Sequence, residues 1–186
     1  IYAPNQACGL IKRKLLDKNI SYDNLKVYNE DTVVKFKHFT VEFFATTHSI
    51  PDSHGIIVTT PNGKIVETGD FKFDLTPIGP MSSIHKMSDT GEKGVRLLMS
   101  ESTNALSPGF SASESKVEEE LQEIFEKKKK GRIIVATFAS NIYRLKHIVE
   151  TCKKYNRKVA LFGRSMENNI EISIEGGYIK DDKIFV

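Results

Sequence analysis

The sequence contains few cysteines and no long apolar run. Only Cys8 and Cys152 occur among 186 residues, and they do not form a Cys-x-x-Cys pair. This scarcity disfavours a disulfide scaffold and a cysteine-ligated zinc module, and it favours a reducing compartment. No apolar stretch approaches the roughly 20 residues that cross a bilayer, and no signal peptide is recognisable at the start. We therefore expect a cytoplasmic protein without a membrane partner.

The excess of positive charge is also small. Lys and Arg total 27 against 24 Asp and Glu, which leaves +3, too little to indicate nucleic-acid binding by itself. With 39% hydrophobic residues, the chain can bury the core of one domain or of two partial ones. It begins at Ile1 and enters a helical pattern at once, and its final residues, 181–186, enter a new apolar segment and stop. We expect an internal part of a longer protein.

Polar residues with useful chemistry follow three predicted strands in the first half of the chain. His48, Asp70 and Glu101 each come directly after an apolar segment rich in β-branched or aromatic residues, which is typical of a strand. The Asn-Gly pair before the strand that leads to Asp70 tolerates positive φ and predicts a hairpin. The expected strands are residues 40–47, 55–60, 64–68 and 95–100.

The second half of the chain predicts a parallel βαβα unit. A helix is expected at 114–130, capped by Ser111 or Ser115, with strands at 133–138 and 158–162 and helices at 142–155 and from about 166. Ligands of such sheets bind beyond the carboxyl ends of the strands. The binding candidates there are Ser140, Asn141, Arg164 and Ser165, although Asn141 and Ser165 are equally good helix caps.

His48 and Asp70 carry side chains that ligate metal ions, and we expect them after two neighbouring strands. Two ligands do not complete a hydrolytic metal site, which needs three or more protein ligands per ion. From spacing alone, the better interpretation of His48 is a residue that only orders its loop, not a metal ligand. The residues by themselves therefore leave the metal site open.

Five motifs, in order along nearly the whole chain, resemble the ribonuclease J family. They are TTHSIPDS at 46–53, TGDFKFD at 68–74, SESTN at 100–104, ATFASN at 136–141 and GRSM at 163–166. The resemblance implies an α/β fold in which residues 1–129 form part of a metallo-β-lactamase αββα sandwich. Residues 130–186 would then form the first part of an inserted β-CASP α/β domain with a parallel sheet.

The same resemblance implies catalytic roles for three residues. His48 would be a metal ligand, Asp70 a ligand bridging two ions, and Glu101 a nearby carboxylate that orients another group through a charge-assisted hydrogen bond. Loop capping is the alternative role for Glu101. Members of the family also carry a His-x-His-x-Asp-His motif that this chain lacks. The two divalent ions, Zn²⁺ or Mn²⁺, would therefore take their remaining ligands from outside this chain, which we expect to be inactive alone.

The activity implied is metal-dependent hydrolysis of RNA in maturation and decay, both endonucleolytic and 5′-to-3′ exonucleolytic. The implied partners are RNA with a 5′-monophosphate, which Ser140, Asn141, Arg164 and Ser165 would help to bind, and further subunits in a homo-oligomer or a hetero-oligomer with a paralogue. Two alternatives stay open. One is a non-catalytic paralogue or structural subunit of a ribonuclease J complex. The other is a small-molecule hydrolase of the metallo-β-lactamase fold, which would not need the βαβα segment.

The remaining histidines lie outside the five motifs, and we expect no metal ligand among them. They are expected as loop or surface residues, with His147 on the polar side of a helix: His38, His54, His85 and His147. Phe71, Phe73 and Phe138 are expected in the core, since phenylalanine near the end of a strand is more often buried than stacked on a base.

Overall fold

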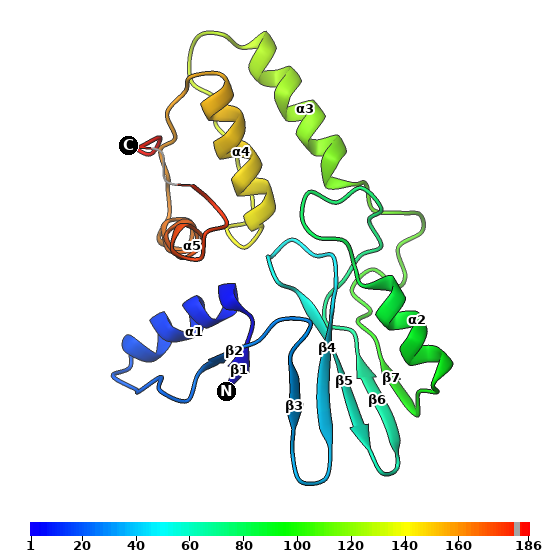
Figure 1. Cartoon of the computed structure of the whole chain (residues 1–186). Coiled ribbons are helices and arrows are strands. Elements are labelled where there is room, and N and C mark those ends of the chain that lie inside the picture. Colours follow the sequence, from blue (N-terminus) through cyan, green and yellow to red (C-terminus); the bar gives the residue numbers. More distant parts are fainter. Residues whose placement is uncertain (181–182) are drawn as a thin grey trace.

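The chain folds into a mixed α/β structure with a sheet at one end and helices at the other (Figure 1). The structure is a computed structural model that describes residues 1–180 and 183–186. Among the helices described, none combines the length and the apolar character that a bilayer crossing requires. The start of the expected final apolar segment, at 181–182, lies outside the described residues.

The sheet has five strands in the order β3-β4-β5-β6-β7. The first four are antiparallel and β7 lies parallel to β6, with Val41 opposite Val58 and Val66 opposite Leu98. Pro61 and Asn62 form the turn of the expected hairpin, and Gly63 takes the positive φ of 118°. The strands are β3 (Val33–Lys35), β4 (Thr40–Ala45), β5 (His54–Thr60), β6 (Gly63–Glu67) and β7 (Leu97–Met99).

Alternating side chains of the sheet pack on its two faces. Phe44 joins Ile57 and Val66 in a small buried cluster, against which Met87 packs from helix α2 (Ile84–Glu92). Phe43 points the opposite way, as successive strand residues do, and its ring stacks on Tyr28 with centroids 3.7 Å apart. Helix α2 was not expected, because its short sequence holds a glycine and few apolar residues.

The second core belongs to the helices that follow. Helix α3 (Glu114–Lys127), α4 (Ile142–Lys154) and α5 (Arg164–Glu175) contribute buried side chains such as Phe125, Leu145 and Ile170 to it. Three of the expected helices are thus confirmed. The cap of α3 is Ser113, whose Oγ accepts from the Ser115 N–H at 3.3 Å, and not Ser111 or Ser115.

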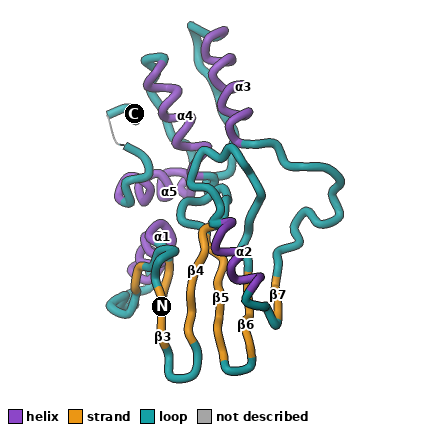
Figure 2. The backbone as a smooth tube through the Cα atoms, turned by 45° about the vertical axis from the view of Figure 1, so that its right-hand side comes forward, coloured by secondary structure: helices purple, strands orange, loops and turns teal. Residues whose placement is uncertain are grey.

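The N-terminal segment packs on the last helix, as Figure 2 shows. Helix α1 (Asn5–Leu16) follows β1 (Tyr2–Ala3), which pairs in parallel with β2 (Lys26–Val27). The buried Gln6 amide donates to Ser173 Oγ of α5 at 3.0 Å. Residues from the two ends of the chain therefore share one interface.

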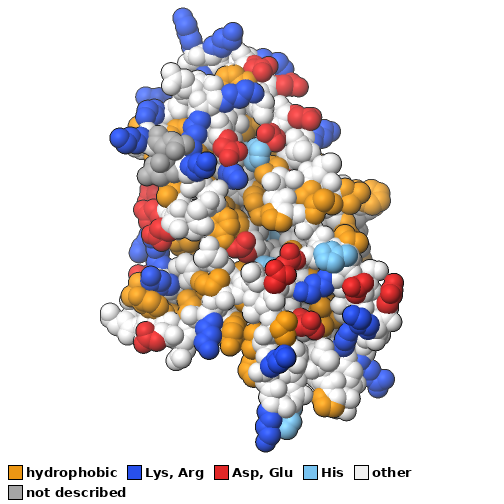
Figure 3. Space-filling view, in the orientation of Figure 1, with side chains coloured by type: hydrophobic (Ala, Val, Ile, Leu, Met, Phe, Trp, Pro, Cys, Tyr) orange, Lys and Arg blue, Asp and Glu red, His pale blue; other side chains and the backbone are white. Residues whose placement is uncertain are grey.

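Apolar side chains also remain at the surface, in patches near the middle of the view in Figure 3. Leu98 on β7 is 61% exposed, and Phe110 in the loop before α3 is fully exposed. β7 is the last strand of the described sheet. The sheet thus presents an apolar edge.

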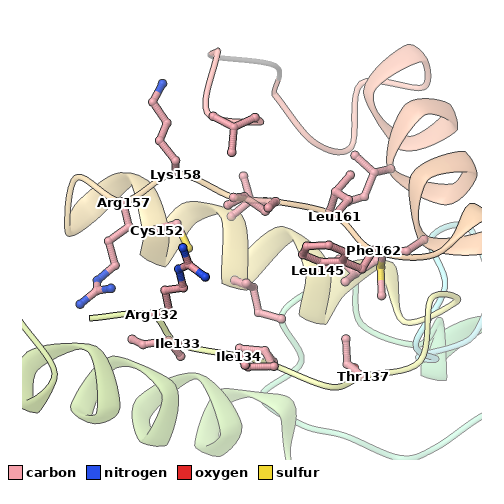
Figure 4. Close-up of a pocket in the computed structure, with 18 of the residues that line it drawn as sticks. Arg132, Ile133, Ile134, Thr137, Leu145, Cys152, Arg157, Lys158, Leu161 and Phe162 are labelled. Carbon is pink, nitrogen blue, oxygen red and sulfur yellow. The ribbon is translucent and has the colours of Figure 1, made fainter. Parts of the chain in front are cut away.

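The expected strands 133–138 and 158–162 are wrong as strands. Both segments are extended, but a strand requires hydrogen bonds to a neighbouring backbone, and the only ladder contact that they make with the described residues is a parallel bridge between Val159 and Phe185. A cavity of about 680 Å³ separates the two segments, lined by Ile133 from one and Leu161 from the other (Figure 4). Side chains of both segments line this cavity, and the two backbones do not pair with each other.

Candidate functional site

Three loops meet at one edge of the five-stranded sheet. Strands β4 and β6 are both antiparallel to β5, and β7 is parallel to β6, so β4, β6 and β7 end at the same edge. His48, Asp70 and Glu101 follow these three strands. The expectation that the strands before His48 and Asp70 are neighbours is wrong, because β5 lies between them.

Backbone hydrogen bonds join the three loops. The Lys72 N–H donates to the Thr47 carbonyl at 2.9 Å, which places the segment after Asp70 beside the residue before His48. The Glu101 N–H donates to Thr68 Oγ1 at 3.2 Å. The structure therefore brings the loops of all three candidate residues together.

Glycine is required at the turn before Asp70. Gly69 has a φ of 61°, and a Cβ built there would lie 2.8 Å from the carbonyl oxygen of His54. A side chain would clash with the backbone and would also be strained in the left-handed region. This close approach explains the glycine in the Thr-Gly-Asp sequence of the second motif.

The three candidate side chains differ in exposure. His48 is half-buried and lines a cavity of about 280 Å³ together with Asp52 and His54. Asp70 is exposed, and its carbonyl oxygen accepts from Ser53 Oγ at 3.3 Å. Glu101 Oε2 accepts from the Thr103 N–H at 2.7 Å. That bond is the loop-capping role that was the alternative for Glu101, and the second oxygen of its carboxylate is left for other contacts.

A complete metal centre is not formed by these residues. Within residues 1–180 and 183–186, no group of three or more His, Cys, Asp or Glu side chains is placed to hold a metal ion. His48 and Asp70 supply suitable donor types on adjoining loops, but their number is below what a hydrolytic ion requires. The described residues therefore do not fit two metal ions by themselves.

Asp52 is a residue that its sequence pattern did not single out. It has a φ of 58° and its carboxylate accepts a short hydrogen bond from the Tyr178 hydroxyl. Asn5 donates to the same hydroxyl at 3.1 Å. Because Tyr178 is half-buried and bonded to Asp52, its pKa is raised above the ordinary value. The loop that carries His48 is thus fastened to the segment after α5.

Two further contacts hold this loop. The Tyr143 N–H of α4 donates to the Ser49 carbonyl at 3.5 Å, and burial raises the pKa of the Tyr143 hydroxyl to about 12. His54 Nδ1 lies 2.7 Å from the Asp52 carbonyl oxygen. Burial lowers the pKa of His54, so the neutral ring is favoured near neutral pH. The expectation that His54 is a loop or surface residue is wrong, since it is the half-buried first residue of β5.

Asp74 is the most heavily hydrogen-bonded carboxylate of the second motif. Its side chain accepts from Ser113 Oγ at 3.0 Å and from the Thr76 N–H at 3.0 Å, and Lys72 Nζ lies 3.2 Å away. Burial alone would raise the pKa of Asp74, but the bonds from Ser113, Thr76 and Lys72 outweigh it and lower the pKa. Asp74 is the last residue of the second motif, but the sequence around it does not predict its hydrogen bond to the distant Ser113.

The four candidates for phosphate binding lie at the starts of two helices that contact each other. Asn141 is 7% exposed, and its Oδ1 accepts from the Arg144 N–H at 3.1 Å, so it caps α4. Ser140 is exposed, as are Arg164 and Ser165 in the first turn of α5. Free N–H groups and a positive dipole end favour anions at such places.

Burial was misjudged for several other side chains. His147 was expected on the polar side of its helix, yet it is 9% exposed with Nδ1 3.2 Å from Glu118 Oε1. Phe73 and Phe138 were expected in the core, yet they are 66% and 81% exposed. The burial of these side chains depends on contacts with other segments, which the local helical and strand patterns do not contain.

Comparison with known proteins adds independent findings. Residues 130–186 match the family described as "Ribonuclease J, beta-CASP domain". The chain is 49% identical to ribonuclease J 1 of Streptococcus pyogenes, with 98% of this chain and 33% of that protein covered. It is 42% identical to ribonuclease J of Mycoplasma pneumoniae, covering 98% and 32%, and 39% identical to that of Thermus thermophilus, covering 97% and 32%.

The chain therefore spans about a third of the length of these curated relatives. Among solved structures, it resembles a protein of unknown function from Enterococcus faecalis with a TM-score of 0.66 and 17% identity. That match covers 94% of this chain and 43% of the other. At this identity the likeness concerns the fold alone.

Proposed function

Because the chain belongs to the ribonuclease J family, we propose that the protein carrying it hydrolyses the phosphodiester bonds of RNA. The observation behind this proposal is the identity of 38–49% to proteins named ribonuclease J over nearly the whole chain. The names of these relatives do not favour the non-catalytic alternative. The convergence of the His48, Asp70 and Glu101 loops at one sheet edge supports the proposal further.

We propose His48 and Asp70 as ligands of two divalent ions, Zn²⁺ or Mn²⁺, and Glu101 as a positioning carboxylate beside them. Such ions activate water for attack on a phosphodiester when bound. Their remaining ligands would come from outside this chain, since the described residues do not complete a site. His48 is half-buried in the loop that follows β4, and ligands supported by a regular element are the ones best held in a metal's geometry.

The finer architecture is part of the same proposal. Residues 1–129 would contribute to a metallo-β-lactamase αββα sandwich, for which the five-stranded sheet with α2 on one face supplies one sheet layer and one helix. Residues 130–186 would begin the β-CASP domain. The exposed Ser140, Arg164 and Ser165, with the N-terminal end of α4 at Asn141, would bind the 5′-monophosphate of RNA and so permit 5′-to-3′ exonucleolytic as well as internal cleavage.

The proposal is tested in a full-length protein that carries this sequence. We expect His48→Ala and Asp70→Ala each to abolish metal-dependent release of nucleotides from 5′-monophosphorylated RNA, because each removes a ligand. His38→Ala and Asp89→Ala are matched controls, since both side chains are exposed and lie outside the candidate loops. His38 is in the turn before β4, at the opposite end of that strand from His48, and Asp89 is on α2. Unchanged turnover by the His48 and Asp70 variants would remove these residues from the site.

The isolated 186-residue chain provides a second check. We expect no cleavage when it is incubated with the same RNA and Mn²⁺ or Zn²⁺. Metal-dependent cleavage that His48→Ala abolishes would mean that another copy of the chain, or other residues of the same copy, supply the remaining ligands. Oligomeric state, measured by sedimentation in the same samples, would distinguish these two sources.

A further inference from the structure

Positive charge gathers where helices α3 and α4 end. Helix α3 finishes at Lys127 and α4 at Lys154, and the segments that follow them are rich in lysine and arginine. In Figure 3, Lys and Arg side chains surround the top of the molecule, where Figure 1 places the ends of both helices. We call six of these residues the basic cluster: Lys128, Lys129, Lys130, Arg132, Arg157 and Lys158.

Contacts of Arg157 hold two parts of the basic cluster together. The Arg157 guanidinium donates to the Gly131 carbonyl at 2.9 Å and makes a short hydrogen bond to the Lys128 carbonyl. It also lies over the Phe125 ring, 5.6 Å from its centroid. The turn after α3 is thereby fixed to the segment after α4. Figure 4 shows Arg132, Arg157 and Lys158 at the same end of the cavity between the two extended segments.

The charge of the cluster exceeds what helix ends require. Each helix C-terminus carries about half a negative charge, so the two ends account for roughly one lysine. The nearby carboxylates are already engaged, with Glu123 paired to Lys127 at 3.1 Å and Glu126 accepting from the Tyr155 hydroxyl at 2.9 Å. In the part of the chain that the structure describes, Lys128, Lys129, Lys130 and Arg132 have no carboxylate partner.

The position of the cluster relates it to the candidate phosphate-binding residues. It lies at the amino ends of segments 133–138 and 158–162, whereas Ser140 and Arg164 follow their carboxyl ends. Six extended residues span about 20 Å, a distance that a single strand of RNA covers with a few nucleotides. We propose that the basic cluster binds the phosphate backbone of single-stranded RNA, without reading its bases. The choice of RNA as ligand rests on the proposed function.

The test measures binding without cleavage. A fluorescently labelled, unstructured RNA of about 16 nucleotides, the upper size of a single-strand site, is titrated with the chain in EDTA. The fluorescence anisotropy of the RNA reports binding. We expect Lys129→Glu/Lys130→Glu to weaken binding about tenfold and to reduce the slope of log K against log salt by about 1.4, since each lost single-strand phosphate contact removes about 0.7.

Lys14→Glu/Lys18→Glu is the matched control. Lys14 and Lys18 are exposed and lie at the end of another helix, α1. Replacing both by Glu changes the net charge by the same amount as the variant of the basic cluster does. We expect this variant to bind within about twofold of the original chain. Circular dichroism of both variants checks that each is folded. Equal weakening by the two variants would indicate only whole-molecule charge and would overturn the proposal, as would unchanged binding by both.

The outcome is independent of the test of the proposed function. Binding through the cluster in EDTA, together with a full-length protein that does not cleave RNA, would overturn the ribonuclease proposal alone. Cleavage that depends on His48, together with no effect of Lys129→Glu/Lys130→Glu on binding, would overturn the cluster alone.

Discussion

A single hydroxyl joins three segments of this molecule at Tyr178. It donates to the Asp52 carboxylate in the loop that carries His48, and it accepts from Asn5 of α1 at 3.1 Å. A hydrogen bond to a charged group contributes about 1.5–3 kcal/mol when neither partner is fully solvated. The position of the His48 loop therefore depends on a residue more than a hundred positions away.

We expect Tyr178→Phe to lower the free energy of unfolding by about 1–2 kcal/mol, because the half-buried Asp52 carboxylate loses its donor. Urea unfolding of the 186-residue chain measures the change. Tyr155→Phe is the control, since the Tyr155 hydroxyl also donates to a carboxylate, that of Glu126, but at the exposed surface. A loss in Tyr178→Phe no larger than in the control would mean that the bond does not fasten the loop.

The chemistry of single residues was predictable where it is intrinsic to the side chain. His48 and Asp70 stood out because imidazole and carboxylate groups are common ligands and both follow strands. The importance of Asp52 and the burial of His147 were not predictable, because each depends on a partner from a distant segment, Tyr178 and Glu118 respectively.

Among the elements, helix α3 is attached to the sheet region through its first turn. Asp74 accepts from Ser113 Oγ and from the Glu114 N–H at 3.3 Å, while Glu114 in turn accepts from Arg144 of α4 at 2.6 Å. Carboxylates at a helix start satisfy free N–H groups and interact favourably with the dipole. Asp74 thus links the loop after Asp70 to α3, and Glu114 extends the link to α4.

We expect Asp74→Asn to lower the free energy of unfolding by about 1–3 kcal/mol at neutral pH. The bonds to the charged carboxylate lower the pKa of Asp74 in the folded state, so its stabilisation is present above the unfolded pKa of about 3.9. It is lost as the pH falls through the lower folded-state pKa. Urea unfolding across this pH range should show the two proteins converge in acid.

The exposed Asp89→Asn provides the reference for that series, and we expect it to match the original chain at each pH. A constant difference between Asp74→Asn and the original chain down to low pH would show that the charge of Asp74 is not what stabilises the attachment.

Elements with a strong local pattern were predictable, and pairing was not. The strands at 40–45 and 54–60, and the helix at 142–154, follow from their own sequences. Segment 133–138 has an equally apolar pattern, but a strand needs a neighbour from elsewhere in the chain, and none pairs with it among the described residues. Local sequence does not contain that information.

At the scale of the whole molecule, two separate cores hold the chain together. Phe44, Ile57 and Val66 form the core of the sheet, and the helical core contains Phe125 from α3 beside residues of α4 and α5. Phe125 precedes residue 130, where the match to the β-CASP domain begins. Helix α3 therefore shares a core with the segment that follows this point in the sequence.

We expect Phe125→Ala to lower the free energy of unfolding by about 3–5 kcal/mol, the range for removing a buried aromatic side chain. Phe110→Ala, at a fully exposed position, should change it by less than about 0.5 kcal/mol. Hydrogen exchange of the α4 amides should accelerate in the first variant only. Equal stability of the two variants would show that α3 does not belong to the helical core.

The contact between α1 and α5 also bears on how the chain folds during synthesis. The hydrogen bond from Gln6 to Ser173 closes a loop of 167 residues. At about 5–20 residues per second, the ribosome needs on the order of ten seconds or more to produce α5 after α1. Until then α1 can contact only its own neighbours in the sequence, such as β2, and the face that packs on α5 remains available to chaperones. Helix α1 is therefore among the first elements to be made and among the last to be placed.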